Sequence, residues 1–208
     1  TVEAAYGTNR ADGLSGKSNL VWRDDKLTSS YTLAASGLST SAASFAMLSS
    51  EGRLRATNAF AHAQLDGELK GEGIELGDDL DATLASTQRS AADTLVAPLL
   101  AKLRAGFARE AQGSTLTASF NLRKTGEMLS ATLPQATLRG GSGATLLALS
   151  RFHLSTGADS EETPRIAGNF STGGDDLPRL VGRMEQPAGG RPRLRMSMAE
   201  YRAGDASI

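Results

Sequence analysis

The sequence contains no cysteine, and this absence removes several kinds of chemistry at once. A disulfide framework, a thiolate metal site and a cysteine nucleophile are all excluded. Only His62 and His153 could act as a histidine base near neutral pH. No serine lies in the G-x-S-x-G motif that marks the nucleophile of many hydrolases. These absences argue against an enzyme.

The sequence also has few aromatic residues, no marked excess of positive or negative charge, and no long apolar run. Aromatics make up 5% of the 208 residues, whereas glycan-binding surfaces usually present several aromatic rings. Lysine and arginine total 22 and aspartate and glutamate 23, so the chain offers no basic field for nucleic acid. It has no run of about 18 apolar residues and no leader pattern, so we expect no membrane span or export signal within it. Because it opens at Thr1 within a strand-like pattern, we expect a segment of a longer protein.

What the sequence does contain is alternation of apolar and polar residues, densest in its C-terminal half. Leu194, Met196 and Met198, for example, alternate with Arg195 and Ser197. A period of two gives each strand one apolar and one polar face. Turn-like segments rich in glycine, proline and aspartate separate the strands, and strands joined by short loops pair antiparallel.

The alternation divides the chain into three sections. Residues 1–78 are predicted to form strands, including one long strand over residues 54–66. Residues 113–208 are predicted to form an antiparallel β section. Turns in the first section are expected at Asp24 and Asp25, at Ser36 and Gly37, and at Glu51 and Gly52.

Between these sections, residues 79–112 are predicted to form a helical insertion, because leucines recur there at a spacing of about four. Pro98 either kinks this helix or starts it after a separate turn. Gly113 lies where a C-terminal cap is expected. The fold class is therefore mainly β: an elongated, curled antiparallel sheet, like a taco-shaped groove, with one amphipathic helix. A closed β sandwich, in which the apolar face would be ordinary core, is the alternative.

Other motifs have plain structural explanations. The glycine-rich run at residues 140–145 lacks the lysine of a phosphate-binding loop, so we interpret it as a hairpin turn. The acidic cluster at Asp78, Asp79 and Asp81 does not match a twelve-residue calcium loop and is interpreted as solvated. We therefore expect no metal, no cofactor and no catalytic residue.

Several stretches resemble the YdbH-type branch of the AsmA-like proteins. The resemblance is carried by Thr94–Leu103 (TLVAPLLAKL), Leu138–Leu149 (LRGGSGATLLAL), Phe170–Gly174 (FSTGG) and Leu177–Met184 (LPRLVGRM), and it covers residues 65–208. It implies a periplasmic protein of Gram-negative bacteria, anchored in the inner membrane through a segment outside this chain. It further implies a β groove for intermembrane phospholipid transport and a role in outer membrane biogenesis.

The partners that the resemblance implies are phospholipid, adjoining β segments of the parent chain, and an outer-membrane or periplasmic protein. The alternative function is a non-catalytic β-sandwich module that binds glycan or protein. Ala131, Ala136, Ala148 and Met184 would be small or flexible liners of a groove. The residues predicted to line the groove or fill the core are Leu129, Leu133, Leu138, Leu147, Leu149, Phe152, Leu154, Ile166, Phe170, Leu180, Leu194, Met196 and Met198.

Overall fold

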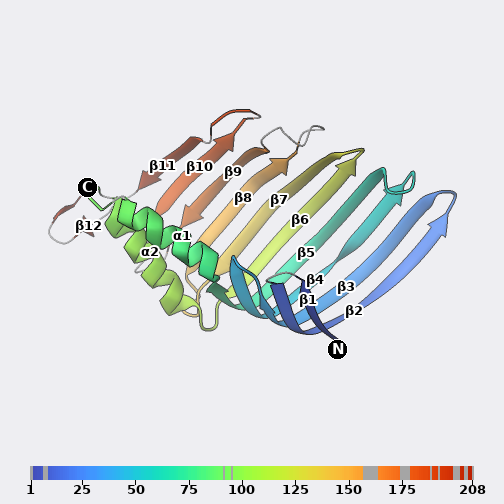
Figure 1. Ribbon diagram of the computed structural model, residues 1–208, viewed down its shortest axis with the longest axis horizontal. Coiled ribbons are helices and arrows are strands. Elements are labelled where there is room, and N and C mark those ends of the chain that lie inside the picture. The colour runs from blue at the N-terminus through green and yellow to red at the C-terminus, as the bar shows by residue number, and fades with distance from the viewer. Residues whose placement is uncertain are drawn as a thin grey trace.

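A computed structural model describes residues 2–6, 9–90, 92–94, 96–156, 164–173, 179–187, 189–191, 193–198, 202–203 and 206–207. One eleven-stranded antiparallel sheet dominates it, and its strands follow one another in sequence order as a single twisted layer (Figure 1). The strands are β1 (Val2–Tyr6), β2 (Asn9–Arg23), β3 (Lys26–Ser39), β4 (Ala43–Thr57), β5 (His62–Leu76), β6 (Thr115–Thr125), β7 (Met128–Arg139), β8 (Thr145–Ser155), β9 (Arg165–Thr172), β10 (Leu180–Gln186) and β11 (Arg193–Met198). A separate two-stranded sheet pairs β12 (Arg202–Ala203) with β13 (Ala206–Ser207).

The mainly β prediction is confirmed, and tight turns explain the simple strand order. Asp24 and Asp25 join β2 to β3 and have φ angles of 48° and 58°. Two successive left-handed residues form a turn whose twist matches that of the flanking strands, so the hairpin closes directly. The turn expected at these two aspartates is therefore correct.

Two other turn predictions, and the predicted strand over residues 54–66, are wrong. Ser36 with Gly37 and Glu51 with Gly52 lie inside β3 and β4, not between strands. The chain instead turns in the middle of residues 54–66, where Asn58, Ala59 and Phe60 have φ angles of 56°, 49° and 68°. Alanine and phenylalanine rarely adopt this conformation, so the sequence carried only a weak turn signal there.

Two helices occupy the section where one helix was predicted. They are α1 (Asp78–Ser90) and α2 (Val96–Glu110), and they connect β5 to its sheet neighbour β6. Pro98 lies in the first turn of α2, where a missing backbone N–H removes no helical hydrogen bond. The Arg104 guanidinium of α2 donates from Nε and Nη2 to the Asp81 carboxylate of α1, at 2.9 and 2.8 Å. This bidentate ion pair ties the two helices together.

The alternative of a closed β sandwich is wrong. In the described part of the chain, no second sheet covers the eleven strands, and the edge strands β1 and β11 do not pair with each other. Only seven hydrophobic residues are buried among the described residues. One face of the sheet therefore stays open over most of its area.

The helices cover this open face at one end only. Leu99 of α2 and Leu180 of β10 form the buried cluster, with Leu103, Phe170 and Met198 packed against it. Figure 1 shows both helices beside the end of the sheet that contains β9, β10 and β11. Among the described residues, neither helix is long and apolar enough to cross a lipid bilayer.

Candidate functional site: the apolar face of the sheet

The strand register places residues from ten strands in one continuous row, and all of them except Ser50 are apolar or glycine. Residues directly opposite each other on neighbouring strands share a face of the sheet. Strands lie about 4.8 Å apart, so a row of ten spans about 43 Å, more than the roughly 30 Å hydrocarbon thickness of a bilayer. The row from β2 to β11 is Gly16, Leu33, Ser50, Leu69, Ala118, Ala136, Leu149, Phe170, Gly182 and Met196.

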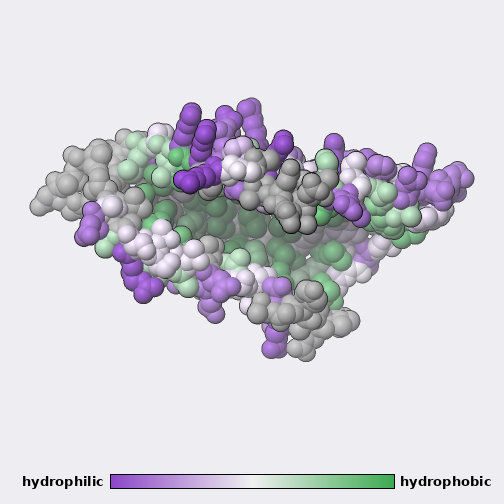
Figure 2. All heavy atoms as spheres, turned by 45° about the horizontal axis from the view of Figure 1, so that its top comes forward, coloured by the Kyte–Doolittle hydropathy of each residue, from purple (hydrophilic) through white to green (hydrophobic). Residues whose placement is uncertain are grey.

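A second row runs beside the first one on the same face. Its only hydroxyl side chain, Ser29, is buried and makes a 2.9 Å hydrogen bond with Ser18, so this polar group is satisfied. We call the surface formed by these two rows and their same-face neighbours the apolar face. Figure 2 shows it as a hydrophobic hollow between hydrophilic margins. The second row, from β2 to β9, is Leu20, Ser29, Leu54, Leu65, Leu122, Ala131, Leu154 and Ile166.

Large side chains on the apolar face remain accessible. The edge residues Leu194 and Met196 are 55% and 51% exposed, and Trp22 and Leu129 are each 53% exposed. Soluble proteins seldom leave a contiguous apolar surface of this extent uncovered unless it binds something. The face therefore has the character of a binding surface.

All thirteen residues predicted to line a groove or fill a core lie on the apolar face by register. Of these, only Leu180 is buried, and the others are half-buried or exposed. One predicted liner is misplaced, because Ala148 lies opposite Thr137 and Ser171 on the other face. Ala148 has the same parity as Phe152 and Leu154, but β8 changes parity between Ser150 and His153, where its pairing with β9 shifts register and Arg151 has a φ angle of 51°.

Aromatic side chains lie over glycines on the neighbouring strand, an arrangement that the sequence reading missed. A Cβ added at Gly168 would be 2.7 Å from Phe152 Cδ2, and one added at Gly67 would be 2.7 Å from Phe120 Cζ. An aromatic ring from the neighbouring strand thus fills the space above each glycine, and the surface of the apolar face is flatter as a result. Glycine inside an alternating strand was the available signal for such close approach.

The N-terminal part of the apolar face contains a measurable hollow. A cavity of about 360 Å³ lies over β2, β3 and β4, and leucines and alanines make up most of its wall. The sequence analysis recognised the alternation of apolar and polar residues in this N-terminal part but did not predict a site there. The apolar liners are Ala11, Leu14, Leu33, Ala34, Ala35, Leu38 and Leu48.

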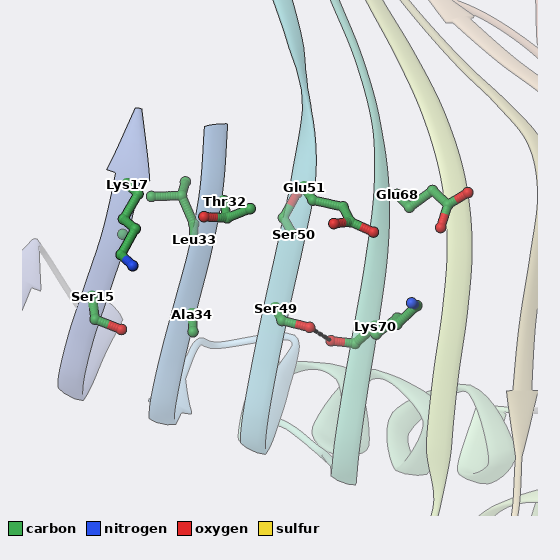
Figure 3. Close-up of a pocket in the computed structure, with 11 residues that line it drawn as sticks. Ser15, Lys17, Thr32, Leu33, Ala34, Ser49, Ser50, Glu51, Glu68 and Lys70 are labelled. Atoms are coloured by element: carbon green, nitrogen blue, oxygen red, sulfur yellow. Dashed lines mark hydrogen bonds between the residues drawn. The ribbon is translucent and has the colours of Figure 1, made fainter. Parts of the chain in front are cut away.

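A larger concavity, of about 490 Å³, is centred on the opposite, polar face. Figure 3 shows its rows of side chains, one of which contains Lys17, Thr32, Glu51 and Glu68. Two lysines and two glutamates line it, so their formal charges balance, and the other lining residues are serines, Thr32 and small or apolar residues. Four charged side chains in the wall distinguish it from the hollow on the apolar face, where Arg10 is the single charged lining residue.

Hydrogen bonds on the polar face favour the ionised form of one carboxylate, that of Asp66. Asp66 accepts hydrogen bonds from Gln64 Nε2, at 2.9 and 3.0 Å, and from Asn121 Nδ2. These bonds, led by Gln64, lower the pKa of Asp66 below its usual value, and Arg55 and Arg123 add to the effect. The network links β5 to β6 on the side away from the apolar face.

The C-terminal end of α2 is tied to the loop between β7 and β8. Glu110 Oε2 accepts hydrogen bonds from the backbone N–H and the Oγ of Ser142, at 3.0 and 2.7 Å. These bonds lower the pKa of the Glu110 carboxyl group. The backbone N–H of Gly141 also donates to the Glu110 carbonyl, at 3.1 Å. The glycine-rich loop therefore holds a helix, and it is a hairpin turn, as expected.

In the described ranges no cluster of three or more histidine or acidic side chains is placed to hold a metal ion. What the geometry does provide is an open antiparallel sheet with one mostly apolar face that extends from β2 to β11. This arrangement defines a β-sheet protein of the hydrophobic-groove class.

The chain belongs to the YdbH-like family, described as intermembrane phospholipid transport protein YdbH, whose family model matches residues 2–207. The match extends beyond the region of residues 65–208 in which the resemblance was recognised. It is a lipid-transport family, not an enzyme family. No curated protein and no solved structure gives a significant match to the chain.

Proposed function

We propose that the apolar face carries the acyl chains of phospholipids between membranes. Membership of the YdbH-like family supports phospholipid as the cargo. The observation that carries the proposal is the row from Gly16 to Met196, in which Ser50 is the single polar residue. Head groups would remain in water along the open side, where polar side chains form the margins seen in Figure 2.

The flat floor of the face suits movement better than tight binding. Transfer of each CH₂ group from water to an apolar surface is favourable by about 0.8 kcal/mol of free energy. This free energy is nearly the same at every point along the surface. Rings that lie over Gly67, Gly168 and Gly182 leave few ridges that would trap an acyl chain. A lipid would therefore move from one part of the apolar face to the next over a low free-energy barrier.

The edges of the sheet support a longer path. In the described residues β1 pairs only with β2, and β11 pairs only with β10. Unpaired edges are templates for further strands. Adjoining β segments of a parent chain, or a periplasmic or outer-membrane protein partner, would pair at the β1 edge and extend the face into a bridge across the periplasm, anchored in the inner membrane outside this chain.

Paired substitutions on single strands test the proposal. We expect Met196→Asp and Phe170→Asp to abolish the co-purification of phospholipid, because an unpaired carboxylate opposes burial of acyl chains. The neighbouring variants Ser197→Asp and Asn169→Asp place the same charge on the polar face and are expected to retain the lipid. Bound lipid would be quantified by native mass spectrometry and by organic extraction.

Exposure makes Met196 the more decisive position. Its side chain is 51% exposed, so aspartate there does not disrupt a core, whereas Phe170 packs against the buried cluster. Circular dichroism would establish that each variant is folded. A folded Met196→Asp protein that keeps its full lipid content, or a wild-type protein that never acquires lipid, would contradict the proposal.

A further inference from the structure

The polar face of the last three strands of the main sheet carries a concentration of arginine. Arg165 on β9, Arg183 on β10, and Arg193 and Arg195 on β11 all point away from the apolar face by register, and all four are exposed. We call these four residues the arginine face. Glu185 is the single acidic residue on the described parts of β9, β10 and β11.

The arrangement of these arginines is unfavourable in isolation. Arg183 lies directly opposite Arg195, and like charges in that position destabilise a sheet. Glu185 forms an ion pair with Arg183 and lies opposite Arg193 in the register. Among the described residues, no acidic side chain lies within ion-pair distance of Arg165, Arg193 or Arg195. An anionic partner would relieve this repulsion.

The rest of the polar face differs in composition. On β4 and β5 the polar positions carry Arg53, Arg55 and Lys70 together with Glu51 and Glu68. Basic and acidic residues are interspersed there, as on an ordinary solvated surface. The strands β6, β7 and β8 carry Arg123, Lys124, Arg139 and Arg151 and no acidic residue, so the positive excess begins beyond β5. Basic residues are densest on β10 and β11, while the whole chain has a net charge of -1.

The edge strand β11 combines this charge with exposed apolar side chains. Arg193 and Arg195 alternate with Leu194 and Met196, which lie on the apolar face and are 55% and 51% exposed. A strand with arginines on one side and open hydrophobic residues on the other matches the boundary between phosphate head groups and acyl chains. An acidic protein would satisfy the arginines but would leave no role for the hydrophobic residues beside them.

We propose that the arginine face docks this end of the sheet on the surface of an anionic phospholipid bilayer, with β11 at the interface. Phosphate groups would bind Arg183, Arg193 and Arg195, while Leu194 and Met196 would place the end of the apolar face next to the acyl chains. The inference rests on the proposed function, because it makes β11 a point at which lipid enters or leaves the face. It adds a membrane contact that the transport path alone does not require.

Vesicle sedimentation of the full 208-residue chain tests this inference. We expect binding to vesicles made of equal parts phosphatidylcholine and phosphatidylglycerol, and much weaker binding to vesicles of phosphatidylcholine alone. The triple variant Arg183→Gln, Arg193→Gln, Arg195→Gln is expected to bind the anionic vesicles on the order of a hundredfold more weakly, or about fivefold for each arginine. Salt at about 1 M, where the screening length is about 3 Å, should abolish the preference for anionic vesicles.

The matched control is the triple variant Arg53→Gln, Arg55→Gln, Lys70→Gln, which removes the same charge from the polar face of β4 and β5. It should bind anionic vesicles much more tightly than the arginine-face variant. Equal loss of binding in both variants would mean that net charge alone matters, and would overturn the inference. The inference would also be overturned if the arginine-face variant bound vesicles as tightly as the wild type does. If that variant lost only its retention on immobilised polyglutamate, the arginines would bind an acidic protein and not a membrane.

Lipid content separates this inference from the proposed function. The arginine-face variant should still co-purify with phospholipid, because its substitutions lie on the opposite side of the sheet. Loss of vesicle binding with retained lipid supports both proposals. If the wild-type chain co-purifies with lipid but does not bind anionic vesicles, only the membrane contact is refuted. If it binds vesicles but co-purifies with no lipid, only the transport path is refuted.

Discussion

Phe170 on β9 lies over Gly182 on β10, so closely that a Cβ added to the glycine would be 2.5 Å from the Phe170 Cε1 atom. The two residues are directly opposite each other in the strand register. The aromatic ring therefore lies flat along the apolar face because its neighbour has no side chain. The same relationship links Phe152 with Gly168.

Substitution of Gly182 by alanine should raise the Phe170 ring out of the floor of the face. We expect a loss of about 1–3 kcal/mol in the free energy of unfolding, since added volume in a filled site causes strain. Co-purified phospholipid should also fall, because a ridge would interrupt the path. The control is Gly173→Ala, where the nearest atom to an added Cβ, the Thr145 carbonyl oxygen, is at 3.6 Å. Urea unfolding would measure both variants, and equal stabilities would contradict the close contact.

Leu99 should be the residue that holds α2 on the sheet. Its side chain is buried against Leu180, and Leu99→Ala removes most of that contact. We expect a cost of about 2–3 kcal/mol and faster cleavage of the helical section in limited proteolysis. Ala105→Ser, at an exposed position of α2, is the control and should leave both measurements nearly unchanged. If the two variants were cleaved at the same rate, the docking role of Leu99 would be disproved.

Ser114 should stabilise the junction of β5, α2 and β6 through its hydroxyl group. This side chain is buried, accepts a 2.7 Å hydrogen bond from the Ile74 N–H and donates a 2.6 Å hydrogen bond to the Ala111 carbonyl. Ser114→Ala leaves the Ile74 N–H without this acceptor, so we expect a loss of about 1–3 kcal/mol in urea unfolding. Ser15→Ala, at an exposed strand position, should change stability by less than about 0.5 kcal/mol. If Ser114→Ala left the free energy of unfolding unchanged, this role would be refuted.

The contact between Glu110 and Ser142 should make stability depend on pH. Ser142 lowers the folded-state pKa of Glu110, so the carboxylate stabilises the fold above its unfolded pKa of about 4.3. This contribution is lost as the pH falls through the folded pKa. The melting temperatures of wild type and Glu110→Gln should therefore differ at neutral pH and converge in acid. A constant difference across this pH range would show that the charge of Glu110 is not the cause.

Sequence patterns were sufficient to predict the class of fold and one half of the apolar face. Leu129, Leu149 and Met196 could be assigned to the same face because each lies in a strand with clear alternation. Ala148 was misassigned because it has the same parity as Phe152 and Leu154, whereas the β8–β9 register shifts between Ser150 and His153, and a shift of one residue moves a side chain to the other face. The loop at Asn58, Ala59 and Phe60 was missed because Ala59 and Phe60 are not typical of left-handed turns, and Asn58 alone was too weak a signal.

The sequence by itself determined that this chain forms antiparallel strands with one apolar face, because a period of two and short turns depend only on neighbouring residues. Only the tertiary structure decided that the sheet stays open and that α2 covers one end of it. It also decided that Phe170 fills the space above Gly182 and that Arg183 faces Arg195. These relationships join residues on different strands or on a helix and a strand, so they depend on register and packing, which no local pattern specifies.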